Sequence, residues 1–148
     1  MISYKEFHDG RLEGLWLDRD ILHVFLSTEE ESRFVLILTD IVALTAGTFS
    51  KQNVLFEVQI KNHQEITLQD IRDVYEIQQG QGHEDREANL LKKIQEEMLV
   101  YLLIDPSCGA NCLALGRSAK LVPLADGFVL PFPAKGACSP IREPPPTV

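Results

Sequence analysis

Apolar and polar positions alternate with a period of two over much of the first sixty residues, which is the spacing of a β-strand. In residues 21–28, one face of the predicted strand carries Leu22, Val24 and Leu26, and the other carries Ile21, His23 and Phe25. The acidic stretch 27–33 predicts a hairpin tip before a strand at 34–40, which residues 41–46 continue or bend. In residues 53–60 we expect Val54, Phe56, Val58 and Ile60 to face inward, and Glu57 and Gln59 outward.

The period changes to that of a helix at Thr67, which is a good N-cap because Asp70 occupies the third position of the first turn. This first helix places Leu68, Ile71, Val74 and Tyr75 on one stripe. The segment QGQGH, residues 79–83, interrupts the pattern and predicts a connector. A second helix is predicted over residues 84–97, with apolar Leu90, Leu91, Ile94 and Met98, and with the i,i+4 pairs Lys92–Glu96 and Lys93–Glu97.

The apolar run MLVYLLI, residues 98–104, predicts a strand buried on both faces, and residues 111–116 and 120–124 are expected to return beside it. Residues 131–148 hold six of the eight prolines and predict a tail that neither pairs in a sheet nor forms a helix. The order of elements predicts an α+β fold: a curved antiparallel sheet or open barrel with two helices packed on one side. We expect one domain over residues 1–130 and a proline-rich tail over 131–148.

The net charge of −8 is unevenly distributed along the 148 residues. Residues 1–97 carry 19 acidic and 10 basic side chains, whereas residues 98–148 are close to neutral. An acidic surface repels phosphate backbones, so nucleic acid is excluded as a partner, while a basic protein fits this charge; simple solubility is the alternative explanation. The start of the chain does not resemble a signal peptide and the longest apolar run is far shorter than a membrane span, which predicts a cytoplasmic protein without membrane contact.

The segment DPSCGANCLALG, residues 105–116, is the nearest approach to a chemical motif. Cys108 and Cys112 are four positions apart, which is neither the Cys-x2-Cys spacing of zinc sites nor that of thioredoxin-type sites. We therefore expect a hairpin in which Gly109 supplies the permissive backbone and Cys112 and Ala114 face inward. A nucleophilic cysteine paired with a histidine from elsewhere in the fold remains open. With Cys138, the three cysteines predict reduced thiols.

Two polar groups have both a chemical and a structural interpretation. His8 and Asp9 are adjacent and suit acid–base chemistry or metal binding, but Asp9-Gly10 is also a turn signal before a strand. The run Glu29-Glu30-Glu31 suits a cation or a basic partner, but three carboxylates at a hairpin tip are also typical of a solvated surface. No complete catalytic or metal-ligating set is present in the sequence, so we predict no cofactor and no metal.

The opening FHDG, residues 7–10, followed by a strand, and the stretch GTFSKQNVLFEVQI, residues 47–60, resemble small bacterial proteins of the immunity-protein kind. That resemblance implies a compact, acidic, non-enzymatic α+β domain that binds and blocks a toxin partner. It implies no individual site residues.

These observations lead to two main functional hypotheses. The first is a non-enzymatic acidic protein-binding domain that contacts its partner through Glu29, Glu30, Glu31, Glu84, Asp85 and Glu87. The second is a small-molecule binder or enzyme with a site in the mouth of the curved sheet, lined by His8, Asp9, His23, Cys108 and Cys112. The oligomeric state is left open, and a homo-oligomer that uses an exposed sheet edge is a third hypothesis.

Overall fold

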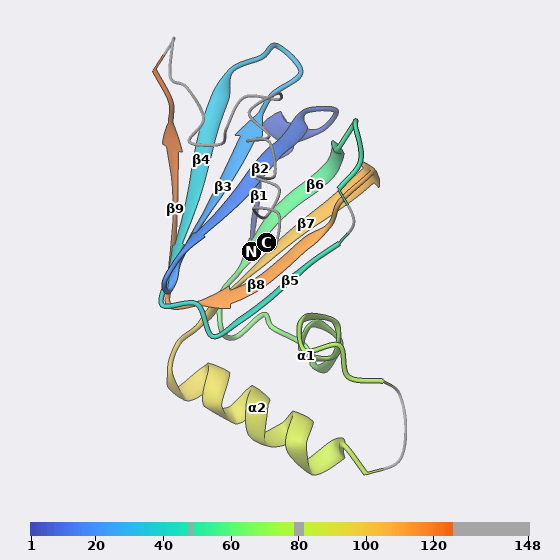
Figure 1. Cartoon of the computed structure of the whole chain (residues 1–148). Coiled ribbons are helices and arrows are strands. Elements are labelled where there is room, and N and C mark those ends of the chain that lie inside the picture. The colour runs from blue at the N-terminus through green and yellow to red at the C-terminus, as the bar shows by residue number, and fades with distance from the viewer. Residues whose placement is uncertain (48, 79–81, 126–148) are drawn as a thin grey trace, which may run out of the picture.

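A computed structural model describes residues 1–47, 49–78 and 82–125 (Figure 1). In these residues nine antiparallel strands form one open sheet, and two α-helices pack on one side of it. The first strands are β1 (Ile2–Ser3), β2 (Arg11–Asp18), β3 (Ile21–Ser27), β4 (Arg33–Thr39), β5 (Ala43–Ala46) and β6 (Val54–Lys61). The helices α1 (Leu68–Val74) and α2 (Glu84–Glu96) follow, and β7 (Val100–Cys108), β8 (Cys112–Gly116) and β9 (Ser118–Pro123) complete the sheet. The predicted α+β fold is confirmed.

The strand order is β5-β8-β7-β6-β2-β3-β4-β9, with β1 added beside β6. The sheet curls so that its two ends approach each other where β4 leads into β5 and β8 leads into β9 (Figure 1). There the Val42 amide donates to the Leu115 carbonyl at 2.9 Å, and the Arg117 amide donates to the Thr39 carbonyl at 2.8 Å. Gly116 is required at this crossing, because a Cβ atom would lie 2.7 Å from the Thr39 carbonyl oxygen.

Two apolar cores result from this curvature. One fills the inside of the curled sheet with residues from most strands, including Leu22, Val24 and Leu26 on the face of β3 that the alternation assigned together. The other lies between the helices and the opposite face of β7 and β8, where Ile71 and Ile94 pack against Tyr101 and Leu115. Because β7 contributes Leu102 to the first core and Tyr101 to the second, the prediction of a strand buried on both faces is confirmed.

The helices begin and end close to where the sequence indicated. Thr67 caps α1, since its hydroxyl accepts from the Asp70 amide while the Asp70 carboxylate accepts from the Thr67 amide. On α2 the expected pairs are present, with Lys92–Glu96 at 3.8 Å and Lys93–Glu97 at 3.9 Å. Met98 is 64% exposed because α2 ends at Glu96, so it does not continue the apolar stripe of that helix. No helix in the described ranges is long and apolar enough to cross a bilayer.

Three expectations about the strands are corrected. In β6, register shifts between Val54 and Glu57 place Leu55 in the core, while Phe56 is 52% exposed. Residues 105–107 belong to β7, so the turn comes at Gly109, whose φ is +99°. Finally, β9 pairs with β4 at the far end of the sheet instead of lying beside β7. The expected boundary at residue 130, the tail 131–148, Cys138 and part of the connector 79–83 lie outside the described residues.

Candidate functional site

A turn before β2 positions the first polar group of the candidate site. The short 3-10 helix Lys5–Phe7 ends in a tight turn, in which the Gly10 amide donates to the Phe7 carbonyl at 2.9 Å. Asp9 has a φ of +61°, a conformation that Asp adopts more readily than most residues. Gly10 lies against β3, where a Cβ atom would come within 2.2 Å of the Ser27 carbonyl oxygen. This contact brings Asp9 close to the end of β3.

The turn between β3 and β4 positions the next groups. The Thr28 amide donates to the Ser32 carbonyl at 2.9 Å, and the Glu31 amide donates to the Thr28 carbonyl at 3.0 Å. Glu31 has a φ of +65°, and the Ser32 amide also donates to the Thr28 hydroxyl at 3.2 Å. The acidic hairpin tip is therefore an ordered turn that holds the Glu29 and Glu31 side chains at the rim of the sheet.

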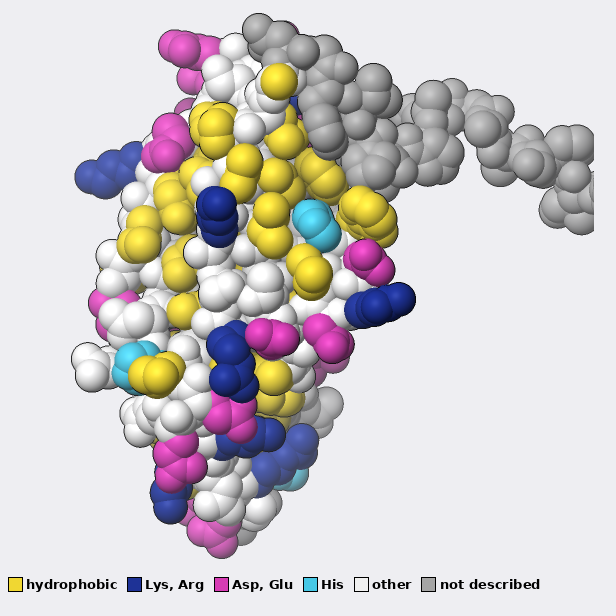
Figure 2. Space-filling view, turned by 90° about the vertical axis from the view of Figure 1, so that its left-hand side faces the viewer, with side chains coloured by type: hydrophobic (Ala, Val, Ile, Leu, Met, Phe, Trp, Pro, Cys, Tyr) yellow, Lys and Arg dark blue, Asp and Glu magenta, His cyan; other side chains and the backbone are white. Residues whose placement is uncertain are grey.

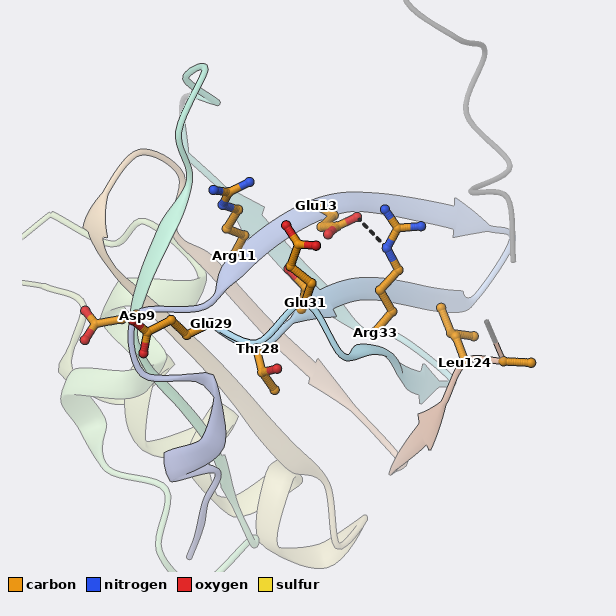
Figure 3. A pocket seen from close by; sticks show the side chains of 10 residues that line it. Asp9, Arg11, Glu13, Thr28, Glu29, Glu31, Arg33 and Leu124 are labelled. Atoms are coloured by element: carbon orange, nitrogen blue, oxygen red, sulfur yellow. Dashed lines mark ion pairs between the residues drawn. The ribbon is translucent and has the colours of Figure 1, made fainter. Parts of the chain in front are cut away.

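The two turns and the neighbouring strand ends surround a pocket of about 360 Å³ at the end of the sheet farthest from the helices (Figure 3). Its lining is strongly charged and consists of Asp9, Arg11, Glu13, Ser27, Thr28, Glu29, Glu31, Arg33, Leu124 and Ala125. We call this set the acidic pocket, because it contains four carboxylates and two guanidinium groups. Arg33 pairs with Glu13, another lining residue, at 3.7 Å (Figure 3).

The carboxylates of the hairpin tip are not neutralised by any other part of the chain that the structure describes. Glu29, Glu30 and Glu31 are exposed and form no ion pair with any residue in the described ranges. Asp9 is different, because its carboxylate lies 2.9 Å from Nδ1 of His8, whose ring packs 5.5 Å from that of Phe56. Negative charge is therefore available mainly at the hairpin tip.

The acidic residues at the start of α2 lie far from this pocket, at the opposite end of the molecule (Figure 1). Glu84 and Asp85 are exposed, but Glu87 is only 4% exposed. Its carboxylate accepts two hydrogen bonds from Arg72, at 3.0 and 2.9 Å, and these bonds hold the pKa of Glu87 below its usual range. Glu87 thus joins α2 to α1, and its charge is used within the protein.

Of the residues in the small-molecule hypothesis, His8 and Asp9 are in contact, but His23, Cys108 and Cys112 do not join them in one site. Cys112 is fully buried in the sheet core, and burial raises its pKa to about 12, whereas Cys108 is exposed at the end of β7. His23 lies on the opposite face of β3 from the core, stacked on Trp16 at a ring distance of 5.2 Å. Of this set, Asp9 lines the acidic pocket. No group of three metal-ligating side chains occurs among the residues that the structure describes.

Several pocket residues were not identified from the sequence. Arg11 and Arg33 are far apart in the chain, but both pair with Ser27 in the sheet, one from β2 and the other from β4. The two arginines align because β2, β3 and β4 pair in this particular register. The sequence indicates that register only through the polar residue at the end of each strand. Glu13 lies on β2 where the register with β3 shifts between Leu12 and Gly14, so regular alternation does not place it in the pocket.

No family model, curated protein or solved structure matches this sequence. The function of the chain is therefore inferred from its own residues.

Proposed function

We propose that this protein is a non-enzymatic protein-binding domain that binds a basic partner at its acidic pocket. The observation that carries the proposal is the charge of the hairpin tip, where Glu29 and Glu31 have no ion-pair partner among the described residues and line a pocket together with Asp9 and Glu13. A lysine or arginine of a partner would pair with the tip carboxylates without first breaking an ion pair between residues that the structure describes. Such charge complementarity mainly speeds association and orients the partner.

The character of the lining favours a protein over a small molecule as the ligand. Small-molecule sites are usually enclosed and lined by apolar and aromatic side chains with a few polar groups. Here eight of the ten lining residues are charged or carry a hydroxyl group, and the apolar ones, Leu124 and Ala125, lie at one side. Neutralisation of a basic toxin, which the resemblance to immunity proteins implies, is one form that this binding would take.

A pull-down that compares two charge variants tests the proposal. The variant Glu29→Lys/Glu31→Lys reverses the tip, and the control Glu84→Lys/Asp85→Lys reverses two exposed carboxylates on α2 with the same change in net charge. Each tagged protein is incubated with lysate of the native host at low salt and eluted with a salt gradient. We expect a stoichiometric basic protein to bind the wild type and the α2 control and to be lost from the tip variant, because salt and charge reversal weaken the same contacts.

The other outcomes contradict the proposal in different ways. Loss from the α2 control alone would place the partner on the helix instead of the acidic pocket. Equal binding to all three proteins would show that charge at neither place contributes. Equal weakening of both variants would show that only the overall charge matters.

A further inference from the structure

The sheet has a second apolar surface that faces away from the core. We call it the outer face and define it by six residues whose side chains project from β2, β3, β4 and β9: Trp16, His23, Phe25, Val35, Ile37 and Val122. The register brings them side by side, since Phe25 pairs with Val35 and Val35 with Val122. Figure 2 shows apolar side chains gathered over these strands. Lys120, which pairs with Ile37, lies within this surface.

Two residues of the outer face are shielded from solvent to an extent that the described elements do not explain. Phe25 is 3% exposed and Val35 is 6% exposed, although Trp16 on the same face is 43% exposed. Side chains stand roughly perpendicular to a sheet, so neighbours shield the sides of an outward-pointing ring and leave its tip open. Within the described ranges, α1 and α2 pack against the strands at the other end of the sheet instead. The shielding therefore calls for a further segment over the outer face.

We propose that residues 126–148 of this same chain lie across the outer face. The path of the chain supports this choice, because β9 is the strand at the edge of that face. The Leu124 amide still donates to the Arg33 carbonyl at 2.9 Å, so the chain follows β4 to the end of the described region. Leu124 and Ala125 line the acidic pocket, at the rim of the outer face. The segment that follows begins next to the surface it would cover.

The sequence of the segment fits a return across this surface. Asp126-Gly127 is a strong turn signal, and the next five residues, FVLPF, supply four large apolar side chains. Strands rise about 3.3 Å per residue, so the seven residues of β3 span about 23 Å and fewer than ten extended residues would cross the face. Pro131 and Pro133 lack amide donors, which disfavours extension of the sheet at its edge and favours packing on the side chains of its face.

A second copy of the chain is a poorer occupant of the outer face. In a two-fold dimer each copy would present the same surface, so the apolar centres would meet with Lys120 of both copies near the contact. Like charges at an interface are unfavourable. A segment joined directly to β9 is also present at an effective concentration of order millimolar, which favours it over separate molecules at ordinary concentrations.

A nitroxide spin label on Cys138 tests the proposal in the full-length chain. Cys108→Ser removes the exposed competing thiol, and Cys112 is buried in the core, so the label reacts at Cys138. The amide signals of Ile37, Lys120 and Val122 should lose most of their intensity relative to the reduced label, while those of α2 should keep theirs. In a Phe128→Ser/Phe132→Ser variant, the same label should leave the signal intensities of the outer face and of α2 unchanged. The amide chemical shifts of this variant should otherwise match those of the wild type.

The emission of Trp16, the single tryptophan of the chain, gives an independent readout on the same surface. We expect Phe128→Ser/Phe132→Ser to increase its quenching by acrylamide, and the control Pro145→Ser near the end of the chain to leave it unchanged. Equal loss of signal over the outer face and α2, or no loss at all, would overturn the proposal. Signal loss that also appears when labelled protein is mixed with unlabelled, isotope-enriched protein would assign the face to a second copy instead.

Discussion

At the scale of single residues, burial decides which reactive groups of this protein are available for chemistry. The two described cysteines are only four positions apart, but Cys108 is exposed and Cys112 is enclosed by the sheet core. A thiol reacts as the thiolate, and burial raises the pKa of Cys112 to about 12. A paired role for the two thiols therefore has no support in their positions.

Alkylation of the native protein should distinguish the two cysteines. We expect iodoacetamide at pH 8 to modify Cys108 within minutes and to leave Cys112 unmodified until denaturant is added, because Cys112 is both inaccessible and protonated. Peptide mapping by mass spectrometry measures each site separately. Rapid modification of Cys112 without denaturant would mean that the β7–β8 hairpin opens in the native state.

The Arg72–Glu87 pair should make stability depend on pH in a defined direction. The pKa of Glu87 is lowered in the folded protein, so its contribution is complete above the usual glutamate range and is lost as pH falls through the lowered value. Glu87→Gln should therefore lower the melting temperature at pH 7, and the difference from the wild type should shrink towards pH 3. Circular dichroism melts across this range measure it, and a difference that stays constant with pH would contradict the assignment.

At the scale of elements, the irregularity of β6 determines which apolar side chains reach the core. Strict alternation assigns Phe56 to the inside, but two register shifts beside it turn Leu55 inward. A β-bulge changes which face each following residue occupies, because the side-chain period of a strand is two. The exposed Phe56 ring then packs beside His8, near the acidic pocket.

Truncation of the two neighbouring side chains checks this arrangement. Leu55→Ala should lower the free energy of unfolding by about 2–5 kcal/mol, as expected for a fully buried leucine. The matched variant Phe56→Ala should cost less than about 1 kcal/mol, since the ring is half exposed. Urea denaturation of both variants measures the difference. A larger loss of stability for Phe56→Ala than for Leu55→Ala would contradict the bulge and would support regular alternation along β6.

At the scale of the whole molecule, the curvature of the sheet depends on the crossing of its two ends at Gly116. Hydrogen bonds join residues 39–42 to residues 115–117 there, and the close approach leaves no room for a side chain.

Gly116→Ala should therefore destabilise the protein by about 1–3 kcal/mol, because the Thr39 backbone would have to move. The neighbouring control Arg117→Ala should change stability by less than about 0.5 kcal/mol, as its ion pairs are long and exposed. Thermal and urea denaturation compare the stabilities of the two variants. Equal stabilities would show that the close approach at Gly116 is not needed to hold the two ends of the sheet together.

Local sequence patterns were sufficient for most of the secondary structure. The alternation of Leu22, Val24 and Leu26 gave one core-facing side of β3, and Thr67 with Asp70 marked the start of α1. Both signals depend on residues within one strand or one helical turn. Their physical basis, the period of the element and the capping of free amide groups, is present before any distant part of the chain is considered.

The arrangement of the strands and the acidic pocket depended on contacts between residues far apart in the chain. The pairing of β9 with β4 and the bulge in β6 could not be predicted from the sequence. Strand order and register are set by the joint packing of several strands. The same applies to Arg11 and Arg33, which meet across β3 only in the folded sheet. The negative charge of residues 29–31 could be read from the sequence. Only the tertiary fold places Glu29 and Glu31 around the same pocket as Asp9 and Glu13.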